Sequence, residues 1–73
     1  MQTLSQLAAL LETTDNQDDA RVFATHDAAI DFAVRYGRRY AAIGTATRSV
    51  PGGYVIDVQR DGNPHYRVGM VRN

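Results

Sequence analysis

The 73-residue chain contains no cysteine and no lysine. Without cysteine, neither a disulfide framework nor a thiolate metal site can form, which fits a reducing compartment. No apolar run approaches the roughly 18 residues that a membrane span needs, and the N-terminal stretch lacks the basic region and the cleavage motif of a signal peptide. We therefore expect a soluble, cytoplasmic protein that does not enter membranes.

Residues that catalyse reactions or hold metals are also scarce. The two histidines, His26 and His65, are far apart and lack zinc-ligand spacing. The serines lie in no nucleophile motif, and the glycines form no phosphate-binding pattern. Asp57 beside His65 across a hairpin is better explained as a surface cross-strand pair than as a catalytic dyad. We expect no catalytic residue, no metal and no cofactor, and hence no enzyme.

Charge is balanced overall but unevenly distributed. Residues 1–31 carry six acidic residues against one arginine, a net charge of −5, and residues 32–73 carry seven arginines against two aspartates, a net charge of +5. This asymmetry indicates charged partners, unless the two halves fold together and neutralise each other. The cations are all arginine, which binds carboxylates or phosphates through two hydrogen bonds and stacks on rings.

Residues 1–73 are expected to form a single domain of marginal stability, because a chain this short buries only about 60% of its unfolded surface. The first segment matches a capping box at Thr3 and Gln6, and predicts a helix over residues 4–13 within a docking helix 1–14. Its apolar stripe consists of Leu4, Leu7, Ala8 and Leu11. Residues 15–19 then read as an acidic loop.

The core, residues 20–73, is expected to follow a β-α-β-β-β plan. Residues 20–24 are a strand candidate, and Thr25 is placed to cap the helix that follows, with Asp27 in its first turn. The residues expected to face the sheet are Ala29, Ile30, Ala33, Val34 and Gly37, with Phe32 and Tyr36 on the flank. Asp31 and Arg35 form a favourable pair on the opposite side, and Gly37 is typical of a helix C-cap.

Three antiparallel strands are predicted after the helix. Residues 41–50 have strand character and are followed by a type II turn with Pro51 and Gly52 at its centre. In the next strand Tyr54, Ile56 and Val58 should face the helix; in the last, that face should hold Tyr66, Val68 and Met70. The other face should display Asp57, Gln59, His65 and Arg67. The sequence thus predicts an α+β domain: a short N-terminal helix, then an antiparallel sheet packed on one helix.

The arginines are the candidate binding residues. The stretch RYGRRY, residues 35–40, is explained by a helix end, where cations complement the helix dipole. This does not prevent Arg38, Arg39 and Tyr40 from also contacting a partner. Arg48 and Arg67 are expected on strands, where a rigid backbone lowers the entropy cost of a contact. These five residues form the predicted partner-binding set.

The order of elements resembles that of some small anti-CRISPR proteins of bacteriophages and mobile elements. The resemblance lies in a strand, a helix that opens with T-x-x-x-A at residues 25–29, and a meander with an aromatic-bearing strand and a D-G turn at residues 54–62. It implies a non-catalytic inhibitor that docks on a CRISPR surveillance complex in the bacterial host cytoplasm and blocks DNA recognition or nuclease recruitment. It provides no contact residue.

Two alternatives remain beside a host protein or ribonucleoprotein partner. A sheet that displays arginine and tyrosine can bind nucleic acid, but the zero net charge and the predicted inward direction of Tyr54 and Tyr66 argue against it. A homodimer through Leu4, Leu7 and Leu11 is the other alternative, because a short apolar helix must be covered.

Overall fold

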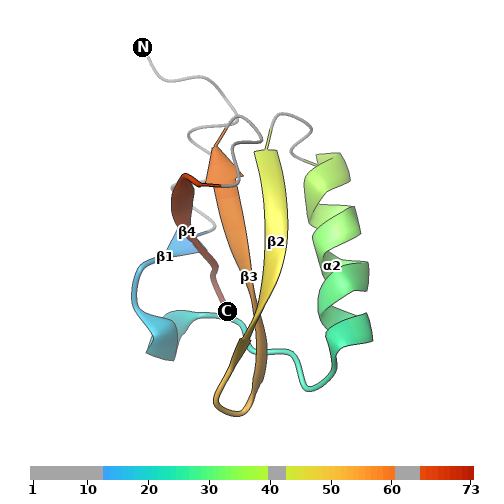
Figure 1. Cartoon of the computed structure of the whole chain (residues 1–73), viewed down its shortest axis with the longest axis vertical. Coiled ribbons are helices and arrows are strands. Elements are labelled where there is room, and N and C mark those ends of the chain that lie inside the picture. Colours follow the sequence, from blue (N-terminus) through green and yellow to red (C-terminus); the bar gives the residue numbers. More distant parts are fainter. Residues whose placement is uncertain (1–12, 40–42, 61–64) are drawn as a thin grey trace.

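The computed structural model describes residues 13–39, 43–60 and 65–73. Its elements are β1 (Thr13–Thr14), a short 3-10 helix η1 (Gln17–Asp19), α2 (His26–Arg39), β2 (Ile43–Val50), β3 (Gly53–Arg60) and β4 (Arg67–Val71). The four strands form one antiparallel sheet in the order β1-β4-β3-β2 (Figure 1), and α2 contacts β2 and β3. The predicted α+β class is confirmed. Within the described part of the chain, no helix is long and apolar enough to cross a membrane.

The start of the described chain differs from the prediction. The capping box and the leucine stripe lie outside the described residues. Thr13 and Thr14, predicted at the end of the docking helix, instead form β1 and pair with Val71 and Met70 of β4. Threonine is β-branched and favours extended backbone. The backbone groups with which these two residues pair belong to β4, far away in the sequence, so the local pattern did not predict a strand here. In the predicted loop 15–19, the last three residues form η1.

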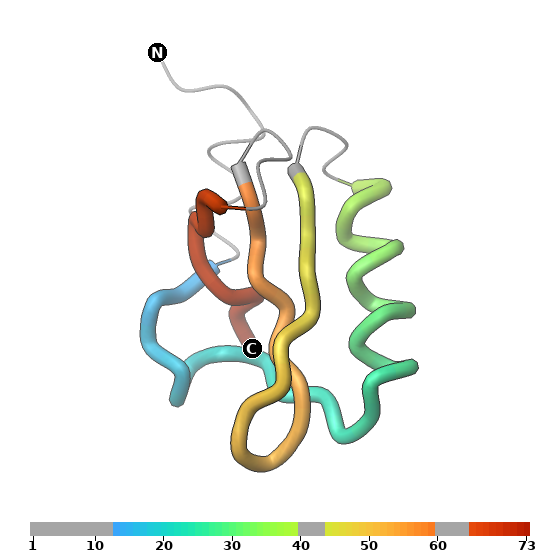
Figure 2. The backbone as a smooth tube through the Cα atoms, in the orientation of Figure 1, coloured from blue at the N-terminus to red at the C-terminus, as the bar shows by residue number. Residues whose placement is uncertain are grey.

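The predicted strand 20–24 is reduced to two isolated antiparallel bridges. Ala20 pairs with Arg72, and Phe23 pairs with Tyr54. This segment runs past the end of the sheet, close to the C-terminus, before it reaches α2 (Figure 2). It therefore touches β4 and β3 in succession instead of following either strand, which is why an extended sequence does not become a full strand here.

Helix α2 begins as predicted but is turned about its axis relative to the prediction. The Ala28 N–H donates to Thr25 Oγ1 at 3.1 Å, as an N-cap requires. The buried residues are Ala29, Ala33 and Tyr36, whereas Ile30 and Val34 are 43% and 49% exposed. The prediction that Ile30 and Val34 face the sheet is wrong. Two alanines let the helix approach the sheet closely, and the Tyr36 ring fills the space beside them.

Gly37 does not end the helix, which continues to Arg39. A methyl group added at Gly37 would meet no atom within 4 Å. We expect Gly37→Ala to stabilise the fold by about 0.5 to 1 kcal/mol, because alanine restricts the unfolded chain and has the higher helix propensity. Urea unfolding monitored by circular dichroism would measure this. An unchanged or lower midpoint would show that Gly37 is needed for some other reason.

The core lies between α2 and the sheet, and a smaller cluster covers the opposite face. Ile56 and Val58 pack against the helix, with Tyr54 partly buried beside them, which confirms the predicted alternation in β3. On the face away from α2, which we call the outer face, Val55 and Met70 are buried under Ala20. The outer face therefore has a buried apolar cluster at one end, beside the polar residues that the sequence predicted for this face.

A bulge in β4 changes which residues share a face. Val58 is opposite Gly69 and Gln59 is opposite Arg67, so Val68 is the extra residue. Val68 packs against the helix-side core while Met70 lies in the outer-face cluster, and Tyr66 is 50% exposed. The prediction that Tyr66, Val68 and Met70 share the core face is wrong because strict alternation does not hold across a bulge.

Candidate binding surface

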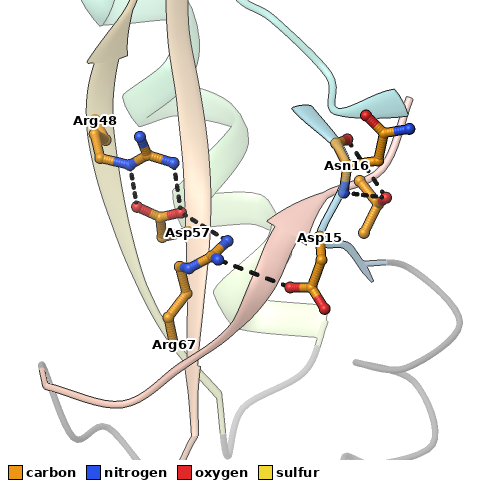
Figure 3. Close-up of polar contacts among 6 residues, drawn as sticks. Asp15, Asn16, Arg48, Asp57 and Arg67 are labelled. Carbon is orange, nitrogen blue, oxygen red and sulfur yellow. Dashed lines mark hydrogen bonds and ion pairs between the residues drawn. The ribbon is translucent and has the colours of Figure 1, made fainter. Parts of the chain in front are cut away.

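A buried carboxylate lies in the middle of the outer face. Asp57 of β3 is only 8% exposed. It accepts two hydrogen bonds from Arg48 of β2, from Nε to Oδ2 at 2.8 Å and from Nη2 to Oδ1 at 3.4 Å (Figure 3). Two such bonds fix the plane and the direction of the guanidinium group, which a single point contact would not do.

A second arginine approaches the same carboxylate from the other side. Arg67 Nη1 of β4 lies 3.8 Å from Asp57 Oδ1, and its Nη2 lies 3.7 Å from Oδ1 of Asp15, which follows β1. Arg48, Asp57, Arg67 and Asp15 thus form a continuous row across the sheet (Figure 3). We call these four residues the outer-face ion cluster. It joins residues from both ends of the sequence.

Strand register explains how these side chains meet. In β2, Ala46 is opposite Asp57 and Arg48 is opposite Val55. Arg48 is therefore the diagonal neighbour of Asp57. The separation between diagonal neighbours is short enough for a long side chain to span. The bulge at Val68 places Arg67 on the same face, where regular pairing of β4 would have turned it toward α2.

The cluster is electrostatically neutral, with two arginines and two aspartates. The hydrogen bond to Asp57, followed by the negative charge of that carboxylate, raises the pKa of Arg48 above its ordinary value. As far as Arg48 is concerned, the stabilisation from its raised pKa is present below the ordinary arginine pKa and is lost as pH rises through the raised value. Both arginine side chains remain accessible, with Arg48 47% and Arg67 43% exposed.

The structure divides the predicted binding residues between two surfaces. Arg48 and Arg67 are brought together by Asp57 on the outer face. Arg38 and Arg39 lie in the last turn of α2, which packs on the opposite face of the sheet, and Tyr40 lies outside the described residues. No single surface of the described chain therefore unites the predicted set.

Sequence reasoning missed both carboxylates of the cluster. Asp57 was expected to pair with His65 at the surface, but its cross-strand neighbour is Met70 and its ionic partners are arginines. Alternation in β3 did place it on the correct face, which was the available signal. Asp15 was assigned to an acidic loop, and nothing in the sequence indicated that β1 would bring it beside β4.

A further arginine contact lies on the helix side of the sheet. The Arg21 guanidinium carbon is 4.8 Å from the centre of the Phe32 ring and 5.6 Å from that of Phe23. Such distances are typical of cation–π contacts. Arg21 was the single cation of the acidic half of the sequence, and its contact holds the segment before α2 against the helix.

Among the residues that the structure describes, no group of three or more His, Cys, Asp or Glu side chains is arranged to hold a metal ion. On the outer face, Asp57 instead orients two half-exposed guanidinium groups, an arrangement suited to polar recognition. In comparisons with known proteins, no family model, no curated protein and no solved structure matched the chain significantly.

Proposed function

We propose that this chain is a small non-enzymatic inhibitor that binds a host protein or nucleoprotein complex through its outer-face ion cluster. One observation carries the proposal: a buried carboxylate, Asp57, holds two half-exposed arginines, Arg48 and Arg67, on rigid strands. Interfaces concentrate their energy in such arginines, and side chains that are already ordered lose less entropy on binding. The resemblance in element order gives the class of target, a CRISPR surveillance complex.

The charge of the cluster favours a protein partner over bare nucleic acid. Phosphate-driven binding needs several cations whose charge is not already balanced. In the cluster, two arginines are matched by two aspartates. A neutral surface with fixed donors and acceptors instead complements a polar protein surface, where both signs of charge are present.

We expect Arg67→Ala to weaken binding to the target complex by about tenfold or more, because it removes one of the two oriented donors. Stability should change little, since Asp57 keeps its two hydrogen bonds to Arg48. The measurement is the affinity of the full chain for purified CRISPR surveillance complexes, together with target-DNA binding by those complexes. Arg35→Ala is the matched control, because Arg35 pairs with Asp31 on the exposed side of α2.

Three results would contradict this assignment in different ways. Surveillance complexes that neither bind the chain nor lose target-DNA binding in its presence would remove the inhibitor function. Loss of binding in an Arg38→Ala, Arg39→Ala variant, with Arg67→Ala unaffected, would move the binding site to the end of α2. Submicromolar affinity for bare duplex at physiological salt would favour the nucleic-acid function.

A further inference from the structure

Strand β2 forms an open edge of the sheet. It pairs with β3 along its full length, from Ile43 to Val50, and no described strand pairs with its other side. Natural edges are usually protected by shortness, charged residues, proline, bulges, or a helix or loop that covers them. The opposite edge, β1, has only two residues, but β2 has eight and contains neither proline nor lysine nor a bulge. Its one charged side chain, Arg48, is bound to Asp57 across the face of the sheet.

The backbone groups at this edge can be assigned. Tyr54 of β3 exchanges both of its backbone hydrogen bonds with Phe23, on the side away from β2. Its partner in β2, Ser49, therefore directs its own N–H and C=O toward the open edge, as antiparallel pairing requires. Every second residue does the same, so the backbone N–H and C=O groups of Thr47 and Thr45 also point toward the open edge.

Helix α2 exposes an apolar stripe beside this edge. Ile30 and Val34, one turn apart, are 43% and 49% exposed. Helical spacing puts them on the same side as His26, whose Nε2 lies 3.3 Å from Thr47 Oγ1 of β2. Figure 1 shows α2 beside β2, on the side away from β4. A strand added to β2 would therefore lie next to Ile30 and Val34.

We propose that a second copy of this chain occupies the β2/α2 surface, which we define as the open edge of β2 together with Ile30 and Val34. Two β2 strands pair antiparallel about a two-fold axis, and the two α2 helices lie side by side and antiparallel on one face of the joined sheet. Such an interface is self-complementary, because each contact is made twice.

Charge complementarity is the reason to choose a second copy over another partner. With the axis at the level of residue 32 along the helix, Ile30 of one helix meets Val34 of the other. Asp27 lies three residues before Ile30, and Arg38 lies four residues after Val34, on the same flank of the helix. Antiparallel packing then brings Asp27 of each copy beside Arg38 of the second copy. The stripe is thus bounded at both ends by opposite charges.

The strand register follows from the same axis. From His26 to Phe32 the helix advances about 9 Å, which β2 covers in about three residues. Because His26 lies beside Thr47, the axis crosses β2 close to Gly44, and we place it at the adjacent Thr45, whose backbone groups face the open edge. Thr45 then meets its own copy, and Arg48 of each chain lies outside the paired stretch. The paired stretch, residues 43–47, contains no charged side chain.

The test uses the full chain in sedimentation or light scattering, with circular dichroism as the check on folding. Wild type should have twice the 8.1 kDa chain mass. Asp27→Arg and Arg38→Asp should each weaken association by about tenfold, since two favourable ion pairs become like-charge pairs. Mixing the two variants should restore association, because only the mixed dimer has opposite charges at both ends. Arg39→Asp, with the same charge change on another side of the last turn, should have no effect on association.

A cysteine crosslink checks the register, because the natural chain has no cysteine. Thr45→Cys should form a covalent dimer on mild oxidation, whereas Ser49→Cys, farther along the same edge, should not. A full chain that stays monomeric would overturn the proposal. So would a dimer that persists in Val34→Arg but is lost in Leu7→Asp, because that result would place the interface in the N-terminal segment.

Discussion

Replacing Gly53 with alanine is expected to destabilise the fold by about 3 kcal/mol or more, or to prevent folding. A Cβ atom at this position would lie 2.2 Å from the carbonyl oxygen of Phe23, and the backbone has φ +151°. The contact is with main chain, so no side chain can move to relieve it. Phe23 and Tyr54 would have to separate, and the segment before α2 would lose its attachment to β3.

Gly52→Ala is the matched control for this effect. Gly52 has φ +94°, as position i+2 of the predicted type II turn requires, but a Cβ there meets nothing within 4 Å. We expect a cost of about 1 to 2 kcal/mol from backbone conformation alone. Urea unfolding of both variants would separate the cost of the backbone conformation from the cost of the contact with Phe23. Equal losses of stability would show that close approach to Phe23 is not what makes Gly53 necessary.

Arg48→Ala is expected to lower the free energy of unfolding by about 2 kcal/mol, because it leaves a buried charged acceptor without its main donor. Asp57 would keep only Arg67, at 3.8 Å. Arg35→Ala removes an arginine of another ion pair, but Arg35 and its partner Asp31 are 74% and 63% exposed. We expect that change to cost about 0.5 kcal/mol or less.

A double variant shows whether Arg48→Ala destabilises the fold by leaving the Asp57 carboxylate unpaired or by removing the packing of the Arg48 side chain. Adding Asp57→Ala to Arg48→Ala should recover part of the lost stability, since the unpaired buried charge is then gone. Thermal or urea unfolding of the two single variants and the double variant would provide the comparison. If the losses of stability in the two single variants simply added up in the double variant, Arg48 would not be what compensates the buried charge of Asp57.

Local features of the sequence determined the parts of the fold that were predicted correctly. Thr25 caps α2 because its hydroxyl reaches an N–H only three residues away. Asp31 and Arg35 pair because one helical turn separates them. Ile56 and Val58 face the helix because a regular strand alternates its side chains. Each of these outcomes depends on residues that are close in the chain, so spacing alone predicted them.

Tertiary structure decided the features that depend on distant residues. The face of α2 that is buried follows from how closely Ala29 and Ala33 approach the sheet, and this is why Tyr36 is in the core while Val34 is exposed. The bulge at Val68 exists only relative to β3. The outer-face ion cluster needs β1, β2, β3 and β4 to be adjacent at once. Sequence spacing carries no information about such neighbours, because strand order and register are set by packing across the whole domain.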